Sequence, residues 1–436
     1  MKVTQTRTIE KRVVDIYEKS IWDYVKEKMS AYKGRVAFAD TGITYGDLLC
    51  LEERRGKKGR LKICAGRTRE EQALEILRCM AKGNVAVPVS LDYGIRQYNY
   101  ICKAVKEDRQ GYDDLAFLMF TSGTTGTPKG VMLTHENIIA NLEYISAYFD
   151  MTGVKNICIA RPLVHIAVLT GELLYALCKG LCIHFYEEPF LPNRLMAFLA
   201  ERKIDVFCAT PTLYASLARC RGRAMPEIKV SAISGERLTE AAARLLAQKF
   251  PDTKFYNVYG LTEHSPRVSA LLPQDFIRKA GSVGKPIGNV KMRIRDGELL
   301  VKSPCVMKGY YRGVKARIRY GWLYTGDAAH TDEEGYYYVD GRKDDMIIRA
   351  GVNIFPQEIE CVLKEFPGVE ECLVYGREDE RYGQKLCAKI KGSVPLSELR
   401  KFAAKNLPPH LIPNEYQLNA QLEYTPSGKL KRGGQV

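Results

Sequence analysis

The stretch LMFTSGTTGTPKGVML, residues 118–133, constrains the fold most. It joins two apolar, strand-like runs through a loop of glycines, hydroxyl side chains and one lysine. Glycines let backbone N–H groups turn inward around an anion, and the hydroxyls add further donors. A Walker A loop is excluded, because Pro128 precedes Lys129 and a strand-like run follows instead of a helix. An ordinary hairpin turn needs fewer such residues, so the stretch predicts a phosphate-holding loop between two strands.

The chain after this loop alternates strand-like and helix-like runs. The alternation extends from VKNICIA, near residue 154, to KFYNVYG, which ends at residue 260. It favours a parallel sheet with helices on its faces. From about residue 280 the chain becomes rich in strands and glycine. We predict an α/β protein, with a large N-terminal domain of parallel α/β subdomains and a β-rich lobe (residues 1–341) and a small α+β C-terminal domain (residues 342–436).

The composition is that of a globular protein with more than one lobe. The chain has 436 residues, of which 46% are hydrophobic and 27% charged. No apolar run approaches the length of a membrane span, and the N-terminus lacks the apolar core of a signal peptide. The 13 cysteines contain no Cys-x-x-Cys pair, which favours reduced thiols over a disulfide or zinc framework. We therefore expect a cytoplasmic protein with no membrane span.

The formal net charge of +15 points to anionic partners. Basic clusters occur at residues 54–62, 219–223 and 308–319. None of them interleaves with aromatic residues in the pattern of an RNA-recognition motif. A solvated basic surface is therefore expected, and anionic small molecules are favoured as partners over nucleic acid.

Three further motifs would suit a nucleotide. NVYGLTEHS, residues 257–265, offers the ring of Tyr259, the hydroxyl of Thr262 and the carboxylate of Glu263. One carboxylate is enough for magnesium that bridges phosphates. YTGDAAH places Asp327 behind a glycine turn, where it could accept both ribose hydroxyls, and TPSGKLKR carries a second loop lysine, Lys429. Each motif alone is a weak signal.

Taken together and in order, these motifs resemble those of the acyl-adenylate-forming, or AMP-binding, superfamily. The motifs are TSGTTGTPKG, YGLTE, YTGD, GRKDDMIIRAGVNIFPQEIE and PSGKLKR. The superfamily includes acyl- and aryl-CoA synthetases and freestanding adenylation domains. The resemblance implies an enzyme that joins a carboxylic acid to the α-phosphate of ATP, releases pyrophosphate and passes the acyl group to a thiol. It implies ATP, Mg²⁺ and coenzyme A, the last as thiol substrate.

The resemblance also implies which residues bind the nucleotide. The loop that embraces the β- and γ-phosphates corresponds here to Thr121, Ser122, Gly123, Thr124, Thr125, Gly126 and Lys129. The adenine site corresponds to Gly235, Glu236, Asn257 and Tyr259, and the adjoining Gly260 belongs to the nucleotide-binding set. Asp327 and Arg342 match the pair that clamps the ribose.

Three residues match the family's catalytic positions. Thr262 matches the α-phosphate contact, Glu263 the magnesium ligand, and Lys429 the lysine that bridges carboxylate and α-phosphate. A cation at that place would stabilise the charge that develops on phosphorus and hold both reactants in line.

The second half-reaction is implied to use a moved C-terminal domain. Asp344 matches the hinge about which that domain turns, and Gly351 matches the glycine that lets the thiol's phosphopantetheine arm pass. Its neighbours Ala350 and Val352 replace a common glycine and a common glutamate. A strand–helix stretch that relatives carry is cut here to residues 91–113, so the N-terminal domain is expected to be compact.

The sequence leaves alternatives for the acid substrate and for the acceptor thiol. His165 in RPLVHIAVLTGELL matches a position that lines the acyl pocket, and this stretch has no aspartate to pair a substrate ammonium. Glu172 is interpreted as a helix-face or pocket-edge residue, so the acid is expected to be aliphatic or aromatic. CoA is the predicted acceptor, with an acyl carrier protein as the alternative. A decayed homologue that only binds a partner is disfavoured, because the matched charged residues are all present.

Overall fold

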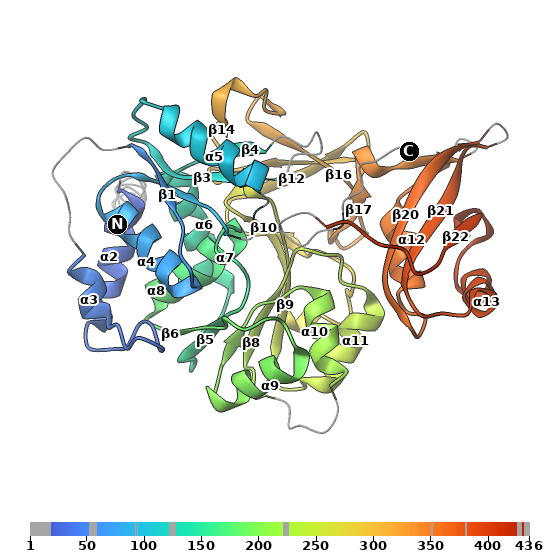
Figure 1. Ribbon diagram of the computed structural model, residues 1–436, viewed down its shortest axis with the longest axis horizontal. Coiled ribbons are helices and arrows are strands. Elements are labelled where there is room, and N and C mark those ends of the chain that lie inside the picture. Colours follow the sequence, from blue (N-terminus) through green and yellow to red (C-terminus); the bar gives the residue numbers. More distant parts are fainter. Residues whose placement is uncertain are drawn as a thin grey trace, which may run out of the picture. The chain divides into compact units, whose positions relative to one another are not determined.

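The computed structural model describes residues 19–51, 59–91, 93, 95–121, 128–220, 226–349, 352–379, 382–424 and 430 (Figure 1). The chain divides into two compact units. The first unit comprises Met1–Met292 and Val301–Leu323, and the second comprises Arg293–Leu300 and Tyr324–Val436. The predicted domain boundary between residues 341 and 342 stays a prediction.

A seven-stranded sheet in the first unit confirms the predicted alternation. Its strand order is β11-β10-β9-β8-β7-β5-β6, in which β5 to β9 are parallel and β10 and β11 are antiparallel additions. The strands are β5 (Asn156–Ile159), β6 (Cys182–Phe185), β7 (Val206–Phe207), β8 (Val230–Ile233), β9 (Lys254–Gly260), β10 (Arg267–Leu271) and β11 (Lys285–Pro286). Helical crossovers connect the parallel strands, because a parallel pair cannot be joined by a tight turn.

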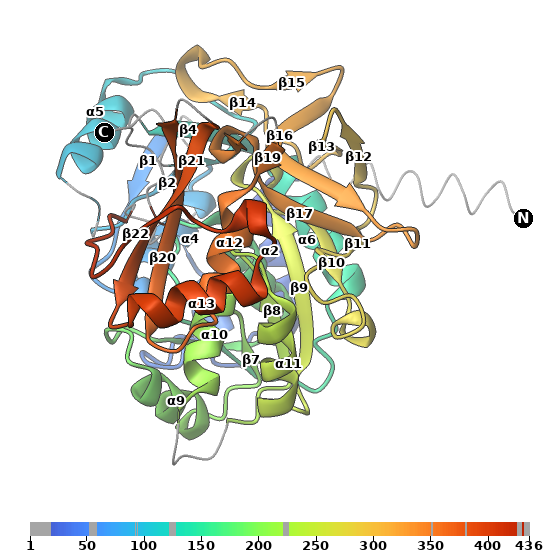
Figure 2. The ribbon, with the colours of Figure 1, turned by 90° about the vertical axis from the view of Figure 1, so that its right-hand side faces the viewer.

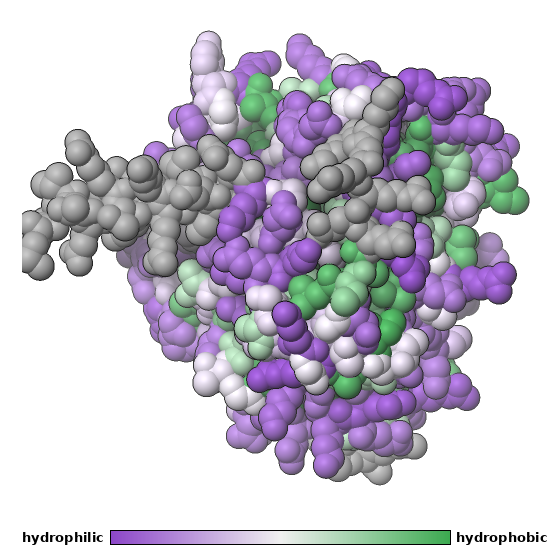
Figure 3. All heavy atoms as spheres, turned by 90° about the vertical axis from the view of Figure 1, so that its left-hand side faces the viewer, coloured by the Kyte–Doolittle hydropathy of each residue, from purple (hydrophilic) through white to green (hydrophobic). Residues whose placement is uncertain are grey.

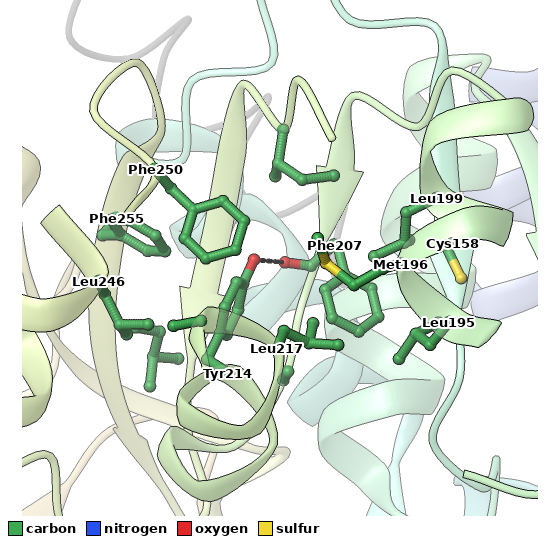
Figure 4. Close-up of a cluster of buried hydrophobic side chains, with 14 of the residues drawn as sticks. Cys158, Leu195, Met196, Leu199, Phe207, Tyr214, Leu217, Leu246, Phe250 and Phe255 are labelled. Atoms are coloured by element: carbon green, nitrogen blue, oxygen red, sulfur yellow. Dashed lines mark hydrogen bonds between the residues drawn. The ribbon is translucent and has the colours of Figure 1, made fainter. Parts of the chain in front are cut away.

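Helices cover both faces of this sheet, as neighbouring side chains of β9 show. Phe255 packs on Tyr214 and Phe276 on one face, while the next residue, Tyr256, packs on Phe149 on the other. The first face is covered by α9 (Pro192–Glu201), α10 (Pro211–Ala218) and α11 (Glu240–Lys249). In that core the buried Tyr214 hydroxyl donates to the Phe207 carbonyl at 2.9 Å (Figure 4). The second face receives α6 (His135–Tyr148).

Capping residues determine where several of these helices begin. Thr134 and Asn137 form a reciprocal capping box at the start of α6. The Thr210 and Thr239 side chains cap α10 and α11 by accepting a hydrogen bond from a backbone N–H of the first turn. Pro211 follows its cap directly and starts α10 at the position where a missing N–H costs nothing.

A five-stranded sheet holds the predicted phosphate loop. Its order is β1-β2-β3-β4-β14, with β3 and β4 antiparallel on either side of the loop. The strands are β1 (Leu61–Cys64), β2 (Val85–Pro88), β3 (Leu115–Thr121), β4 (Lys129–Thr134) and β14 (Gly309–Tyr310). The helices of this region are α2 (Ile21–Met29), α3 (Tyr45–Leu49), α4 (Arg69–Ala81) and α5 (Ile95–Glu107). Helix α5 occupies most of the stretch 91–113 that the sequence interprets as shortened.

The segment after β5 departs from a regular α-helix. Helix α7 (Ile166–Val168) leads into a π-helical turn, η2 (Leu169–Leu174), and then into α8 (Tyr175–Lys179). Every residue of η2 is buried. A π-helical turn is rare and often occurs at functional sites, so this segment bears on the site described below.

The second unit combines a β-rich part and a small α+β part. The first part contains most of β12 (Lys291–Arg295), β13 (Glu298–Lys302) and β16 (Trp322–Thr331), and all of β17 (Tyr337–Arg342). The short β15 (Ile318–Arg319) pairs with the first two residues of β16 and belongs to the first unit. The second part contains β18 (Ile347–Arg349), β19 (Val352–Ile354), β20 (Val369–Asp379), β21 (Gly383–Gly392) and β22 (Glu415–Gln417). Helices α12 (Pro356–Leu363) and α13 (Leu396–Asn406) lie beside β20, β21 and β22 (Figure 2). They bury Ile359, Leu363 and Leu399 in the core of this part.

The surface and the helices agree with the composition. Hydrophilic side chains predominate on the face drawn in Figure 3, where hydrophobic ones gather only in small patches. In the part of the chain that the structure describes, no helix is long and apolar enough to cross a membrane.

Candidate active site

The candidate site lies in the first unit where the parallel strands end. Arg161 follows β5, the turn Ser234–Glu236 follows β8, and Thr262 and Glu263 follow β9. Parallel neighbours place their carboxyl ends at one edge of a sheet, and open α/β sheets bind ligands outside that edge. Tertiary structure therefore gathers there several residues that are far apart in the sequence.

The Ser234–Glu236 turn leaves its backbone open to a ligand. Gly235 has φ +93°, a conformation that favours glycine, and it is exposed. The Glu236 carboxylate accepts the Thr212 hydroxyl at 2.6 Å and the Thr212 backbone N–H at 3.1 Å. These bonds hold the turn against the first residues of α10, so its shape is fixed before any ligand arrives.

Strand β9 carries the aromatic and amide groups of the predicted adenine site. Asn257 is buried, and its amide donates to the Ser282 carbonyl at 2.7 Å. Tyr259 is partly exposed near the end of the strand. Gly260 is required by packing, because a Cβ there would lie 2.3 Å from the Pro266 carbonyl oxygen. The amide of Asn257 thus has a structural partner, and its predicted contact with adenine remains a prediction.

Glu263 stands on a rigid support. It lies in a short 3-10 turn, η3 (Thr262–His264), and its carbonyl accepts the Met307 N–H at 2.9 Å. The next side chain, His264, is fully buried, with Nε2 2.7 Å from the Ser303 hydroxyl and Nδ1 3.0 Å from the Arg267 carbonyl. Burial lowers the pKa of His264 to about 3. A neutral imidazole with a hydrogen bond at each ring nitrogen therefore anchors the turn that carries Glu263.

Tyr310 contacts both Lys129 of the predicted phosphate loop and Glu263, the predicted magnesium ligand. Its hydroxyl donates to Glu263 Oε1 at 2.8 Å, and Lys129 Nζ lies 5.8 Å from the centre of its ring. The backbone fixes this arrangement, because Tyr310 of β14 pairs with Val131 of β4, two residues after Lys129. The sequence analysis missed Tyr310. The run KGYYRG offered two tyrosines, but nothing in it indicated which one faces the site.

Magnesium would fit at Glu263. Among the described residues, no group of three or more His, Cys, Asp or Glu side chains is gathered where it could hold a metal ion. Magnesium that bridges phosphates takes one or two protein carboxylates and completes its shell with phosphate oxygens and water. A single carboxylate, oriented by the Tyr310 hydroxyl, fits that donor set.

The segment predicted to line the acyl pocket holds a buried ion pair. The Glu172 side chain is fully buried in η2 and meets Arg161 Nη2 at 2.5 Å, while Arg161 Nη1 donates to the Ser234 hydroxyl at 3.2 Å. Burial raises the pKa of Glu172, and Arg161 opposes that shift. Glu172 is fully buried in η2 and does not lie on an exposed helix face, and its interpretation as a pocket-edge residue stays a prediction. His165 is half-buried just before α7.

The second unit brings Asp327 and Arg342 together. They face each other across the β16–β17 pair, where Arg342 Nη1 donates to Asp327 Oδ1 at 3.1 Å and to the Thr325 carbonyl at 2.9 Å. The Asp327 side chain is 8% exposed and that of Arg342 is 44% exposed. The predicted ribose clamp therefore has a carboxylate that is held in place by a more accessible guanidinium.

Part of the predicted site falls outside the described residues. This part comprises Ser122, Gly123, Thr124, Thr125 and Gly126 of the phosphate loop, the C-terminal Lys429 and the tunnel residue Gly351. The flanking Thr121 is described, and its hydroxyl donates to the Lys129 carbonyl at 3.4 Å across the β3–β4 pair. Asp344, the predicted hinge, is exposed in the short turn η6 (Lys343–Asp345) of the second unit.

Comparison with protein families assigns both parts of the chain. The model of the AMP-binding enzyme family matches residues 64–311. The model of the AMP-binding enzyme C-terminal domain matches residues 358–429. The two matches follow each other in the order expected from the motifs.

Curated relatives are CoA ligases of several kinds. The chain is 34% identical over 346 residues to a long-chain-fatty-acid–CoA ligase of Bacillus subtilis. This match covers 73% of this chain and 61% of the ligase. It is 32% identical over 345 residues to a feruloyl-CoA synthase of an Amycolatopsis species, which covers 74% of this chain and 70% of the synthase. The match thus spans about three fifths of the Bacillus ligase.

A solved structure with the same fold covers nearly the whole chain. It is the o-succinylbenzoate CoA synthetase of Bacillus subtilis in complex with an acyl-adenylate intermediate. The TM-score is 0.84 at 25% sequence identity, and the match covers 95% of this chain and 97% of the synthetase. The same synthetase has been solved with ATP and a magnesium ion, and that structure also matches with a TM-score of 0.84.

Proposed function

The chain belongs to the AMP-binding enzyme family, and on this premise we propose that it is an AMP-forming acid:CoA ligase. It adenylates a carboxylic acid with release of pyrophosphate and then transfers the acyl group to CoA. The observation that carries the proposal is the meeting of Lys129 and Glu263 at Tyr310. A cation beside a metal-binding carboxylate suits the phosphates of ATP and their magnesium ion.

The first half-reaction uses residues from several of the motifs. Lys129 and the phosphate loop hold the β- and γ-phosphates, and Asp327 with Arg342 holds the ribose. Thr262 contacts the α-phosphate. Glu263 would hold a magnesium ion, which would supply positive charge against the phosphates. Lys429 holds the attacking carboxylate against the α-phosphate, where its charge stabilises the transition state. Every one of these roles has a residue of the appropriate chemistry in this chain.

The second half-reaction needs an acceptor thiol, and CoA is proposed. The curated relatives described above are CoA ligases. The excess of basic residues suits the phosphates of CoA and an acidic carrier protein alike. In this step the C-terminal domain, residues 342–436, turns about Asp344, so that Gly351 lines the path of the thiol. An acyl carrier protein is the alternative acceptor, and no feature of the described residues favours it.

ATP–pyrophosphate exchange with a panel of carboxylic acids tests the first half-reaction. We expect exchange that depends on both the acid and magnesium. The second half-reaction is tested by giving the enzyme ATP, its best acid, and either CoA or a phosphopantetheinylated carrier protein. Acyl-CoA should form at the higher rate. Efficient acylation of the carrier without acyl-CoA formation would establish the alternative, and no exchange with any acid would refute the ligase.

A variant links the chemistry to one residue outside the described part of the chain. Replacing Lys429 by alanine should slow adenylation by at least about 10²–10³-fold, the loss typical for one preorganised charge donor. Transfer from a supplied acyl-adenylate to CoA should be spared, because that step does not use the lysine. Equal impairment of both half-reactions would contradict the assigned role.

A further inference from the structure

The buried pair of Arg161 and Glu172 contains polar atoms that no hydrogen bond satisfies among the described residues. Glu172 Oε2, Arg161 Nε and the Thr170 hydroxyl are buried and have no hydrogen-bond partner among the described residues. Each such group costs about 1–3 kcal/mol relative to a satisfied one. A buried ion pair is itself weak evidence of stabilisation, because apolar residues of similar volume often serve as well. Stability therefore gives no reason for this arrangement.

The charges around the pair do not balance. Arg267 is a second buried guanidinium beside the same π-helical turn, since a Cβ at Gly171 would lie 3.2 Å from its Nη2. Arg267 donates to the Tyr148 hydroxyl at 2.7 Å, and its guanidinium carbon lies 4.9 Å from the ring of Phe149. Two guanidinium groups thus accompany one carboxylate. The cluster has an excess of positive charge and of hydrogen-bond donors.

Arg161 is the member of the cluster that a ligand could reach. Its side chain is 16% exposed, whereas that of Glu172 is fully buried. One N–H of Nη2 serves Glu172, and one N–H of Nη1 serves Ser234. Each of these nitrogens carries a second N–H. Glu172 and Ser234 thereby fix the plane of the guanidinium and leave it with donors to offer.

The position of Arg161 relates it to the acyl group. It follows β5 at the carboxyl edge of the sheet and precedes His165, the residue matched to the acyl pocket, by four positions. Its partner Ser234 adjoins Gly235 of the adenine-site turn. The residues assigned to the phosphates, Lys129 and Glu263, are instead gathered at Tyr310.

We propose that Arg161, oriented by Glu172, binds an oxygen atom of the acyl substrate other than those of the reacting carboxylate. This inference rests on the ligase function proposed above and names its substrate class. The substrate is an acid with a second oxygen function, such as a hydroxyl, carbonyl or carboxylate group, that accepts a hydrogen bond from the guanidinium. A purely hydrocarbon acid leaves the buried donors unpaired and is activated poorly.

Matched pairs of acids test the proposal in ATP–pyrophosphate exchange. Suitable pairs are cinnamate with para-hydroxycinnamate and octanoate with octanedioate. For at least one pair, the wild-type kcat/KM should favour the oxygenated member by about 10- to 100-fold, which corresponds to one hydrogen bond to a charged group. The double variant Arg161→Met/Glu172→Met removes both charges together, so that no buried charge is left unpaired. It should lose this preference while still activating the hydrocarbon member.

Two further variants separate recognition from folding. Arg161→Lys keeps the charge but loses the planar fork, and it should give an intermediate preference. Arg69→Met/Glu187→Met removes another arginine–glutamate pair of the same unit, which meets at 2.8 Å. That control should keep the wild-type preference.

The outcomes distinguish this inference from the proposed function. A preference that survives in the Arg161→Met/Glu172→Met enzyme, or a wild-type preference for the hydrocarbon member in both pairs, would overturn the inference and leave the ligase intact. An equal loss with every acid and a raised KM for ATP would place Arg161 at the nucleotide and also overturn it. Absence of exchange with every acid would overturn the proposed function and this inference with it.

Discussion

At the scale of single residues, Tyr310 explains how two distant motifs form one site. Its hydroxyl orients the Glu263 carboxylate at 2.8 Å, and its ring faces Lys129. A residue that hydrogen-bonds a metal-ligating carboxylate fixes the orientation of that ligand, and its loss typically weakens metal binding by about 10- to 100-fold. The two roles of Tyr310 use different parts of the side chain and can be separated by substitution.

Replacing Tyr310 by phenylalanine removes the hydroxyl and keeps the ring. We expect the magnesium concentration for half-maximal adenylation to rise by about 10-fold or more, while the KM for ATP at saturating magnesium changes little. Leucine at this position also removes the ring and should raise both. Tyr311→Phe is a suitable control, because the Tyr311 hydroxyl bonds to Asp108, away from Glu263. An unchanged magnesium titration in the Tyr310→Phe enzyme would remove the tyrosine from the metal site.

The carboxylate itself gives a second residue-scale prediction. Glu263→Gln keeps the size of the side chain and its carbonyl acceptor but loses the negative charge that attracts the cation. Adenylation by this variant should require more magnesium than adenylation by the wild type, and raising the magnesium concentration should restore part of the rate. A magnesium titration that coincides with that of the wild type would show that the ion binds elsewhere.

At the scale of elements, the start of helix α6 makes stability depend on pH. The Nδ1 atom of His135 accepts the Ile21 N–H at 3.2 Å, so this nitrogen must be unprotonated. Burial lowers the pKa of His135 from its usual 6.5. The unfolded chain therefore takes up the proton first as the pH falls. The contribution of His135 is complete above about pH 6.5 and is lost progressively below it.

We expect unfolding by urea to need less denaturant at pH 5.5 than at pH 7.5, with His135 contributing up to about 1.4 kcal/mol per pH unit below 6.5. His135→Gln keeps an acceptor but does not titrate, and it should show a smaller difference between the two pH values. Some difference should remain, because burial also lowers the pKa values of His184 and His264. Equal losses in wild type and variant would assign the acid sensitivity to other groups.

At the scale of the whole molecule, the proposed two-step reaction requires the C-terminal domain to turn. The proposed hinge residue, Asp344, is exposed, so substitution there disturbs little packing. Proline at this position fixes φ and restricts the residue before it. We expect Asp344→Pro to slow thioester formation far more than adenylation, since only the second step needs the turned domain. The two effects are measured by stopping the reaction at set times and quantifying pyrophosphate and acyl-CoA separately.

Asp344→Ala is the matched control for the hinge. It removes the same carboxylate but leaves the backbone free, so it should retain both half-reactions at similar rates. If the alanine variant loses thioester formation as completely as the proline variant, the side chain matters and not the backbone rotation. If neither variant affects it, the hinge lies elsewhere.

The sequence by itself determined the local features of this protein. Its apolar alternation predicted the parallel sheet, because the periods of strands and helices are written in neighbouring residues. The glycine-rich stretch between β3 and β4 was predicted from its own residues, whereas the pair of Asp327 and Arg342 was implied by the resemblance to the AMP-binding superfamily. A motif of this kind can be recognised in the sequence, because a glycine turn and the residues beside it lie within a few positions of one another.

Tertiary structure alone decided which side chains from distant segments meet. Tyr310 lies 47 residues from Glu263 in the sequence, and only the pairing of β14 with β4 turns its hydroxyl toward that carboxylate. Arg161 and Glu172 are 11 residues apart and form a salt bridge between the end of a strand and a π-helical turn. Within a regular helix, only residues three or four positions apart are close enough for such a pair. Such contacts depend on strand register and on how buried polar groups find partners, and neither is set by local spacing.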